Sequence, residues 1–152
     1  MNPRTTGIKG LDAQLGGGLA PGSVVLITGY PLGADELLGM HLALGDGPCA
    51  IASAIPDSTL QDIIERLDGD ASQIQIEPEG FDFADAARKG RVLVQDFGRF
   101  VPLTDLQTLE EELTEIHAAA QESGHIVVLQ MPEGTWNAAS LATILLHADA
   151  WF

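Results

Sequence analysis

Two kinds of hydrophobic pattern alternate along this chain. Short continuous apolar runs predict buried strands, and segments with apolar residues three and four positions apart predict amphipathic helices. The expected strands cover residues 24–28, 49–53, 92–95 and 126–130, with a shorter strand at 74–76 and a final one at 149–152. The expected helices cover residues 35–44, 57–67, 104–123 and 137–147. Continuous apolar strands separated by helices indicate an α/β fold with a mostly parallel sheet covered on both faces.

The helix before Gly124 carries the most regular pattern. Its apolar positions step by three and four residues, and its glutamates mostly occupy the opposite face. Thr104 and Gln107 have the spacing of a capping box, and Ser58 and Gln61 have the same spacing at the start of the helix over 57–67. Gly124 is expected to end the longer helix, and an asparagine at position 137 to begin the last one.

Charge is the most unusual feature of the composition. The chain has 152 residues, which suits a single domain spanning residues 1–152, and a formal charge of −15 from 22 acidic and 7 basic residues. We expect no direct nucleic-acid binding, because binding of a phosphate backbone needs clustered Lys and Arg residues. Carboxylates spread over the chain, with few lysines, are what we expect of a halophilic protein from a high-salt cytoplasm, where salt screens the self-repulsion. An acidic mesophilic protein is the alternative.

Segments for targeting or membrane insertion are not recognisable. No apolar run approaches the roughly 20 residues that span a bilayer, and no basic start followed by an apolar stretch marks a secretion signal. We therefore expect a cytoplasmic protein with no membrane partner. The single cysteine, Cys49, is expected to be a small core residue, and the four histidines lack metal-ligand spacing.

A more specific pattern covers residues 6–33. It combines a TGI-x-GLD segment, a Gly16–Gly18 turn, a PGS turn, a strand and a glycine-containing loop. This pattern resembles the start of a RecA-superfamily ATPase core of the KaiC/RadA-like branch, and the later elements follow the same order over nearly the whole chain. The resemblance implies a RecA-like three-layer sandwich of archaeal type, and it leaves open that the chain is truncated after its last strand. It also places Asp96 at the Walker B position and Gln130 at a sensor position.

The phosphate loop departs from that family. The residues retained from its general shape are Gly29, Pro31 and Gly33. Where the family has Gly-Lys-Thr, this chain has Ala34, Asp35 and Glu36. The lysine neutralises phosphate and the threonine holds Mg²⁺, so both cation-handling positions have become carboxylates. One charge pair at 4 Å is worth roughly 4 kcal/mol at an effective dielectric of about 20, so reversing the charge should abolish ordinary ATP affinity.

The family's catalytic glutamate pair is also missing. Ile55 and Pro56 stand where these residues would activate the attacking water. We therefore expect a degenerate, non-hydrolysing pseudo-ATPase that needs no cofactor. It would be a regulatory or scaffolding module that contacts a second copy or an active RecA/KaiC-like paralogue. The alternative is an ATP-binding ATPase with an unorthodox loop, whose missing charge would come from Lys9 or Lys89.

The new carboxylates have two further interpretations. Asp35 and Glu36 fall in the first turn of a helix, where free N–H groups and the helix dipole favour anions. Their carboxylates would then occupy the position where phosphate binds in active relatives. If the loop and the strand that ends at Asp96 lie side by side, the three carboxylates instead converge as an oxygen-only site for Mg²⁺ or Ca²⁺. The chain would then be a cation-binding structural protein. Asp96 could also be a plain turn or cap residue.

Overall fold

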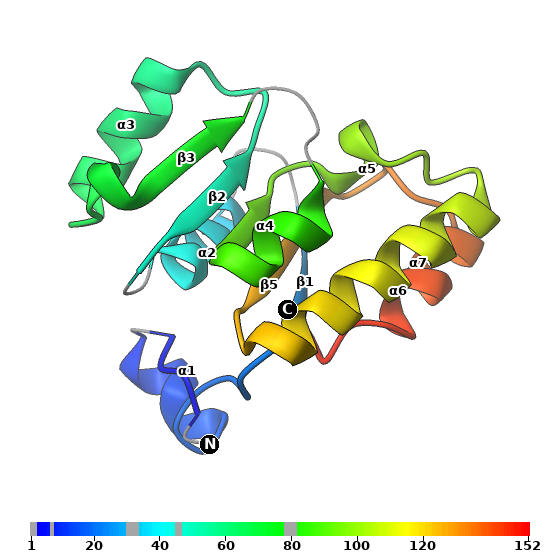
Figure 1. Ribbon diagram of the computed structural model, residues 1–152, viewed down its shortest axis with the longest axis horizontal. Coiled ribbons are helices and arrows are strands. Elements are labelled where there is room, and N and C mark those ends of the chain that lie inside the picture. The colour runs from blue at the N-terminus through cyan, green and yellow to red at the C-terminus, as the bar shows by residue number, and fades with distance from the viewer. Residues whose placement is uncertain (1–2, 7, 30–33, 45–46, 78–81) are drawn as a thin grey trace.

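The computed structural model describes residues 3–6, 8–29, 34–44, 47–77 and 82–152 (Figure 1). The strands are β1 (Val24–Gly29), β2 (Cys49–Ala52), β3 (Ile74–Glu77), β4 (Arg91–Val94), β5 (Val127–Pro132) and β6 (Ala150–Trp151). The helices are α1 (Lys9–Gln14), α2 (Ala34–Ala43), α3 (Asp57–Arg66), α4 (Phe83–Lys89), α5 (Phe97–Phe100), α6 (Leu106–Ser123) and α7 (Ala138–Leu145), with a 3₁₀ turn η1 (Ala71–Gln73). Each strand expected from the sequence is present within two residues of its predicted ends.

The strands form a six-stranded sheet in the order β3-β2-β4-β5-β1-β6. Every pairing between them is parallel. The longest pairing joins β1 to β5 and runs from Val24 opposite Val127 to Gly29 opposite Pro132. Because all strands run the same way, their carboxyl ends share one side of the sheet. We call this side the carboxyl edge and the opposite side the amino edge.

Helices cover both faces of the sheet, as the continuous apolar strands predict. Along β1, Val24 and Leu26 join the core cluster formed with α4, α6 and α7. The alternate residues Val25 and Ile27 join the cluster formed with α2 and α3. Figure 1 shows α4 and α6 in front of the sheet and α2 behind it. The predicted three-layer α/β architecture is confirmed.

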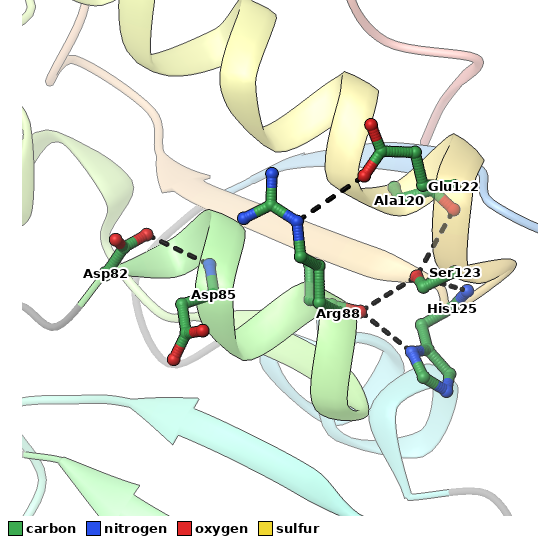
Figure 2. A network of polar contacts seen from close by, with 8 residues as sticks. Asp82, Asp85, Arg88, Ala120, Glu122, Ser123 and His125 are labelled. Atoms are coloured by element: carbon green, nitrogen blue, oxygen red, sulfur yellow. Dashed lines mark hydrogen bonds and ion pairs between the residues drawn. The ribbon is translucent and has the colours of Figure 1, made fainter.

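The last turn of α4 is fixed to the end of α6. The carbonyl of Ala87 accepts hydrogen bonds from Ser123 Oγ at 2.9 Å and from His125 Nδ1 at 2.8 Å (Figure 2). A carbonyl only accepts, so His125 carries its proton on Nδ1. These bonds satisfy one of the free carbonyls at a helix end. Beside them, Arg88 and Glu122 form an exposed ion pair at 3.4 Å, which contributes little stability.

The glycine triplet reverses the chain before β1. Gly16, Gly17 and Gly18 all have positive φ angles. Arg4 and Leu19 then pair as an antiparallel bridge, with N–H···O distances of 2.7 and 2.8 Å. A Cβ on Gly18 would lie 2.1 Å from the carbonyl oxygen of Arg4, so only glycine fits there. The local role of the triplet is therefore a turn that holds the first residues against the strand entrance.

The helix ends were predicted only in part. α6 begins one residue later than expected: Asp105, not Thr104, is its cap and accepts a hydrogen bond from the Thr108 N–H at 3.2 Å. The capping box predicted at Ser58 is wrong, because α3 begins directly after Pro56 with no side-chain cap.

Two other helix signals are confirmed. Gly124 ends α6 with a φ of 74°. Asn137 caps α7 through a capping box: its Oδ1 accepts from the Ser140 N–H at 2.9 Å, and its own N–H donates to Ser140 Oγ at 3.0 Å.

Candidate functional site

A pocket lies at the carboxyl edge, among residues that end or follow three neighbouring strands, β2, β4 and β5. Its volume is about 150 Å³. Its described lining consists of Ser53, Ala54, Ile55, Gln95, Asp96, Gln130 and Pro132. Ligands of open α/β sheets bind outside the carboxyl ends of strands, so this carboxyl-edge pocket is the candidate functional site. Two larger hollows, of about 230 and 250 Å³, open beside the start of β2, and their described linings include neither Asp96 nor Gln130.

Two neutral side chains form the floor of the pocket. Ser53 follows β2 and Gln95 follows β4, and both are buried. Ser53 Oγ donates a hydrogen bond to Gln95 Oε1 at 2.6 Å and accepts one from the Ile55 N–H at 3.0 Å. This pairing satisfies the serine hydroxyl internally and fixes the turn after β2 to the end of β4.

Asp96 borders the pocket from an unusual backbone conformation. Its φ of 56° and ψ of 66° place it in the left-handed region, which aspartate tolerates better than most residues. It precedes α5, yet its side chain makes no capping hydrogen bond to that helix. Asp96 is therefore a half-buried turn residue that lines the pocket without serving as a helix cap. Its position after β4 is the one expected from the sequence, and a Walker B role stays a prediction.

Gln130 is a buried amide on β5 that also borders the pocket. Its side chain is 3% exposed, and its Oε1 has no hydrogen-bond partner among the described residues. A Cβ on Gly39 of α2 would lie only 2.9 Å from this oxygen, so the amide is wedged against the helix. An unsatisfied buried polar atom costs about 1–3 kcal/mol, so this amide calls for an explanation.

The strand order corrects one expectation about the site. β5 lies between β1 and β4, so the strand that leads to the phosphate loop and the strand that leads to Asp96 are not side by side. At roughly 4.8 Å per strand, their axes are about 10 Å apart. Gln130, on the intervening strand, occupies the position between them. The sequence could not show this, because the order of strands depends on long-range pairing.

The loop that the sequence predicts to be a degenerate phosphate loop falls largely outside the described residues. Gly29 ends β1 and the backbone of α2 begins at Ala34, but residues 30–33 and the side chains of Asp35 and Glu36 lie outside the description. The predicted convergence of these carboxylates with Asp96 therefore stays a prediction. Among the described side chains, no group of three His, Cys, Asp or Glu residues could hold a metal ion.

All seven basic residues lie in the described part of the chain, and they are distributed unevenly. Lys9 begins α1. Figure 1 shows α1 at the amino edge, opposite to the edge toward which the strand arrows point. Lys89 ends α4 just before β4 and pairs with Asp85 at 2.7 Å. Both lysines are thus at the amino edge, opposite the carboxyl end of β1. Four arginines also lie there, at the start of β1 or β4 or the ends of α3 and α4: Arg4, Arg66, Arg88 and Arg91. Arg99 of α5 is the exception at the carboxyl edge.

Some pocket residues were not anticipated from the sequence. Ser53, Gln95 and the close approach of Gly39 emerge only in the structure. Their positions in the sequence could have indicated them. Ser53 ends one apolar run and Gln95 ends another, and polar residues at the carboxyl ends of parallel strands converge on one edge of the sheet.

Comparison with solved structures defines the class of fold. The chain is similar to the flagellar accessory protein FlaH from Methanocaldococcus jannaschii, with a TM-score of 0.68 and 12% sequence identity over 93% of this chain and 75% of that one. At this identity the likeness shows the fold alone, and it confirms a RecA-like α/β core. The sequence model described as "Family of unknown function (DUF7125)" matches residues 4–152, and the chain belongs to that family. No curated protein matches the sequence. Within the described residues, no helix has the length and apolar character to cross a membrane.

Proposed function

We propose that this RecA-like chain is a regulatory or scaffolding module of the cytoplasm that does not hydrolyse ATP and acts through protein contacts. The observation that carries the proposal is the position of the lysines. An acidic residue, Asp35, stands where the family's loop lysine would be, and both Lys9 and Lys89 are at the opposite edge of the sheet. A triphosphate at this loop would meet carboxylates without a lysine to neutralise it.

The pocket chemistry also supports a non-hydrolysing role. Ile55, which stands at the family's catalytic glutamate pair, lines the pocket with a hydrocarbon side chain that cannot take a proton from water. Ser53 and Gln95 are engaged with each other. Asp96 is therefore the one described lining residue with a carboxylate.

Surface features fit a module that binds proteins. Leu146 is 81% exposed and Trp151 is 55% exposed. Trp151 lies on β6, at one edge of the sheet, with its Nε1 donating to Thr28 Oγ1 at 3.0 Å. Edge strands leave backbone N–H and C=O groups open to pairing with another chain. A second copy or an active RecA/KaiC-like paralogue is the proposed partner class.

Calorimetric titration with ATP and ADP in the presence of Mg²⁺ tests the nucleotide part of the proposal. We expect no binding below millimolar concentrations and no phosphate release. Micromolar affinity would contradict the proposal.

A loop variant separates binding from hydrolysis. Ala34→Gly with Asp35→Lys and Glu36→Thr should raise nucleotide affinity if the loop alone prevents binding, while hydrolysis stays absent because Ile55 remains. The matched control is Asp62→Lys with Glu65→Thr on exposed positions of α3, which changes the net charge equally. Equal gains in nucleotide affinity in the two variants would indicate an effect of net charge and not of the loop.

A further inference from the structure

Two histidines lie where α6 meets the end of α7 and the start of β6. His147 follows α7, and its Nε2 is 3.5 Å from Glu110 Oε1 of α6. His117 belongs to α6, and its Nε2 is 3.5 Å from Asp149 Oδ2. Each imidazole therefore meets a carboxylate of a different element. We call these four residues the histidine junction.

The contacts of His147 are those of a doubly protonated ring. Its Nδ1 lies 3.1 Å from the carbonyl oxygen of Thr143, which only accepts, so Nδ1 carries a proton. Its Nε2 lies 3.4 Å from Thr114 Oγ1, whose one proton is donated to the carbonyl of Glu110 at 2.7 Å. Nε2 therefore faces two acceptors, this hydroxyl oxygen and the Glu110 carboxylate, and a second proton on the ring satisfies them. The carbonyls at the end of α7 favour the same cation.

The elements around the two rings bring few other charges. α7 and β6 contain no charged residue, and neither does the segment over 20–23 that leads into β1. On α6, the positions three and four residues from His117 are uncharged: Leu113, Thr114, Ala120 and Gln121. Among the described residues, Glu110 and Asp149 are therefore the carboxylates at ion-pair distance from the rings.

The junction also holds the start of β6 against β1. The N–H of Asp149 donates to the carbonyl of Val24 at 2.7 Å, and its Oδ2 accepts from the Val24 N–H at 2.8 Å. β6 itself has two residues, and the N–H of Phe152 just beyond it donates to the carbonyl of Leu26 at 2.9 Å. Because few bonds hold this short edge strand, its attachment depends on the junction beside it.

We propose that His117 and His147 form a proton-dependent clasp that fastens β6 to the edge of the sheet. Histidine changes its charge between roughly pH 5 and 8. At the acid end of this range, each Nε2 carries a proton toward a carboxylate. At the alkaline end, Nε2 of His147 loses that proton and its lone pair faces two oxygens, so the junction loosens. The inference goes beyond the proposed function and holds whether or not the chain binds nucleotide.

The clasp would control access to the edge of the sheet. When β6 detaches, the N–H and C=O groups of β1 that pair with it become open to another chain. Acid conditions should therefore keep this edge closed, and alkaline conditions should let it open more often.

Hydrogen exchange of backbone amides in the ¹⁵N-labelled chain tests the clasp. The reporter is the Phe152 N–H, and the reference is the Gln95 N–H, which donates to the carbonyl of Ala52 at 2.9 Å on the other side of β5. NMR gives both exchange rates at pH 5.5 and pH 8, and each is divided by the intrinsic rate at that pH. Protection of Phe152 should be about three- to tenfold greater at pH 5.5, as expected for two partly exposed ion pairs. Protection of Gln95 should change less.

Variants connect this pH dependence to the junction. His117→Gln with His147→Gln removes the titrating groups and should reduce the Phe152 ratio to that of Gln95. Glu110→Gln keeps both histidines and changes an exposed side chain, so it should fold, and it should remove part of the effect because His147 loses its charged partner. His41→Gln on α2 is the matched control and should leave the ratio unchanged.

Three outcomes would each overturn the inference. The first is an equal ratio for Phe152 and Gln95 in the wild type. The second is an unchanged Phe152 ratio in the double histidine variant or in Glu110→Gln. The third is an equal loss of pH dependence in His41→Gln, which would indicate a general effect of histidine on the fold.

Discussion

At individual positions, the backbone conformation and the burial restrict to different degrees which side chain can be present. Gly18 sits where a Cβ would meet the backbone of Arg4, whereas Gly16 has a similar positive φ but nothing within 4 Å of an added Cβ. Cys49 is buried at the start of β2. Asp96 and Gln130 place polar groups at one pocket despite the cost of burial or backbone strain. These positions lead to two predictions.

Substitution of the two glycines should separate steric clash from backbone strain. Gly16→Ala should cost about 1–2 kcal/mol, the cost of the left-handed conformation alone. Gly18→Ala adds a clash with main-chain atoms that cannot move aside, so its loss should exceed that of Gly16→Ala by more than about 1 kcal/mol. Urea denaturation of both variants measures the difference. Equal losses would mean that the Arg4–Leu19 bridge does not constrain the turn.

Cys49 should be chemically silent in the folded protein. Burial raises the pKa of its thiol to about 12, and the charge of Arg91 only partly opposes this. A thiol reagent at pH 8 should therefore label the native protein far more slowly than the unfolded protein. The folded state holds this proton more tightly, so stability should fall as pH rises from the unfolded pKa near 9 toward 12. Cys49→Ala should reduce that fall, and rapid labelling of the native protein would contradict the burial.

Among the elements, α6 combines an apolar face with a run of glutamates. Its buried residues pack against α4 and the sheet, and its last turn carries the Ser123 contact to α4. Glu112 lies nearer the core than Glu111 and is only partly exposed. Burial raises the pKa of the Glu112 carboxyl, and the charges of Glu115 and Asp82 raise it further. The charged form of Glu112 therefore weakens the packing of α6 at neutral pH.

Neutralising Glu112 should stabilise the fold. At pH 7, Glu112→Gln should raise the free energy of unfolding by no more than about 0.5 kcal/mol, because the group is partly solvated. The melting temperature should rise slightly as a result. Since a raised pKa means that the folded state binds the proton more tightly, the wild type gains this stability as pH falls through that pKa. The advantage of the variant should then disappear in acid. The control, Glu111→Gln on the exposed face, should not show this pH dependence.

At the scale of the whole molecule, net charge opposes the compact state. The formal charge is −15 over 152 residues, and exposed pairs such as Lys89 with Asp85 offset little of it. The charge is also uneven, because six of the seven basic residues lie at the amino edge. The carboxyl edge therefore has fewer basic residues than the amino edge, which bears on any partner that approaches the pocket.

Salt should stabilise the protein. The Debye length falls from about 10 Å at 0.1 M to about 3 Å at 1 M salt, which screens repulsion between surface carboxylates. The melting temperature should rise with KCl between 0.1 and 2 M in scanning calorimetry. A flat or falling melting temperature over this range would remove the argument for a halophilic protein.

The sequence by itself determined the local elements and which residues stand in the predicted phosphate loop. The strands and the long helices follow from periodic hydrophobic patterns, and Gly124 ends α6 as its left-handed conformation requires. Asp96 and Gln130 were predicted at the ends of strands; Asp96 does follow β4, whereas β5 continues two residues beyond Gln130. The short helices α4 and α5 were not predicted, since segments of seven and four residues carry too little periodicity and depend on packing of Phe83 and Phe97 against the core.

Only the tertiary structure decided which of these residues meet. The placement of β5 between β1 and β4 separates the loop strand from Asp96, and it brings Gln130 beside Gly39 of α2. The packing of α1 and α4 puts both lysines at the amino edge, and the pairing of β2 with β4 brings Ser53 to Gln95. Such contacts join residues distant in sequence. They arise from the pairing of strands and the burial of helix faces, which local patterns favour but do not order in space.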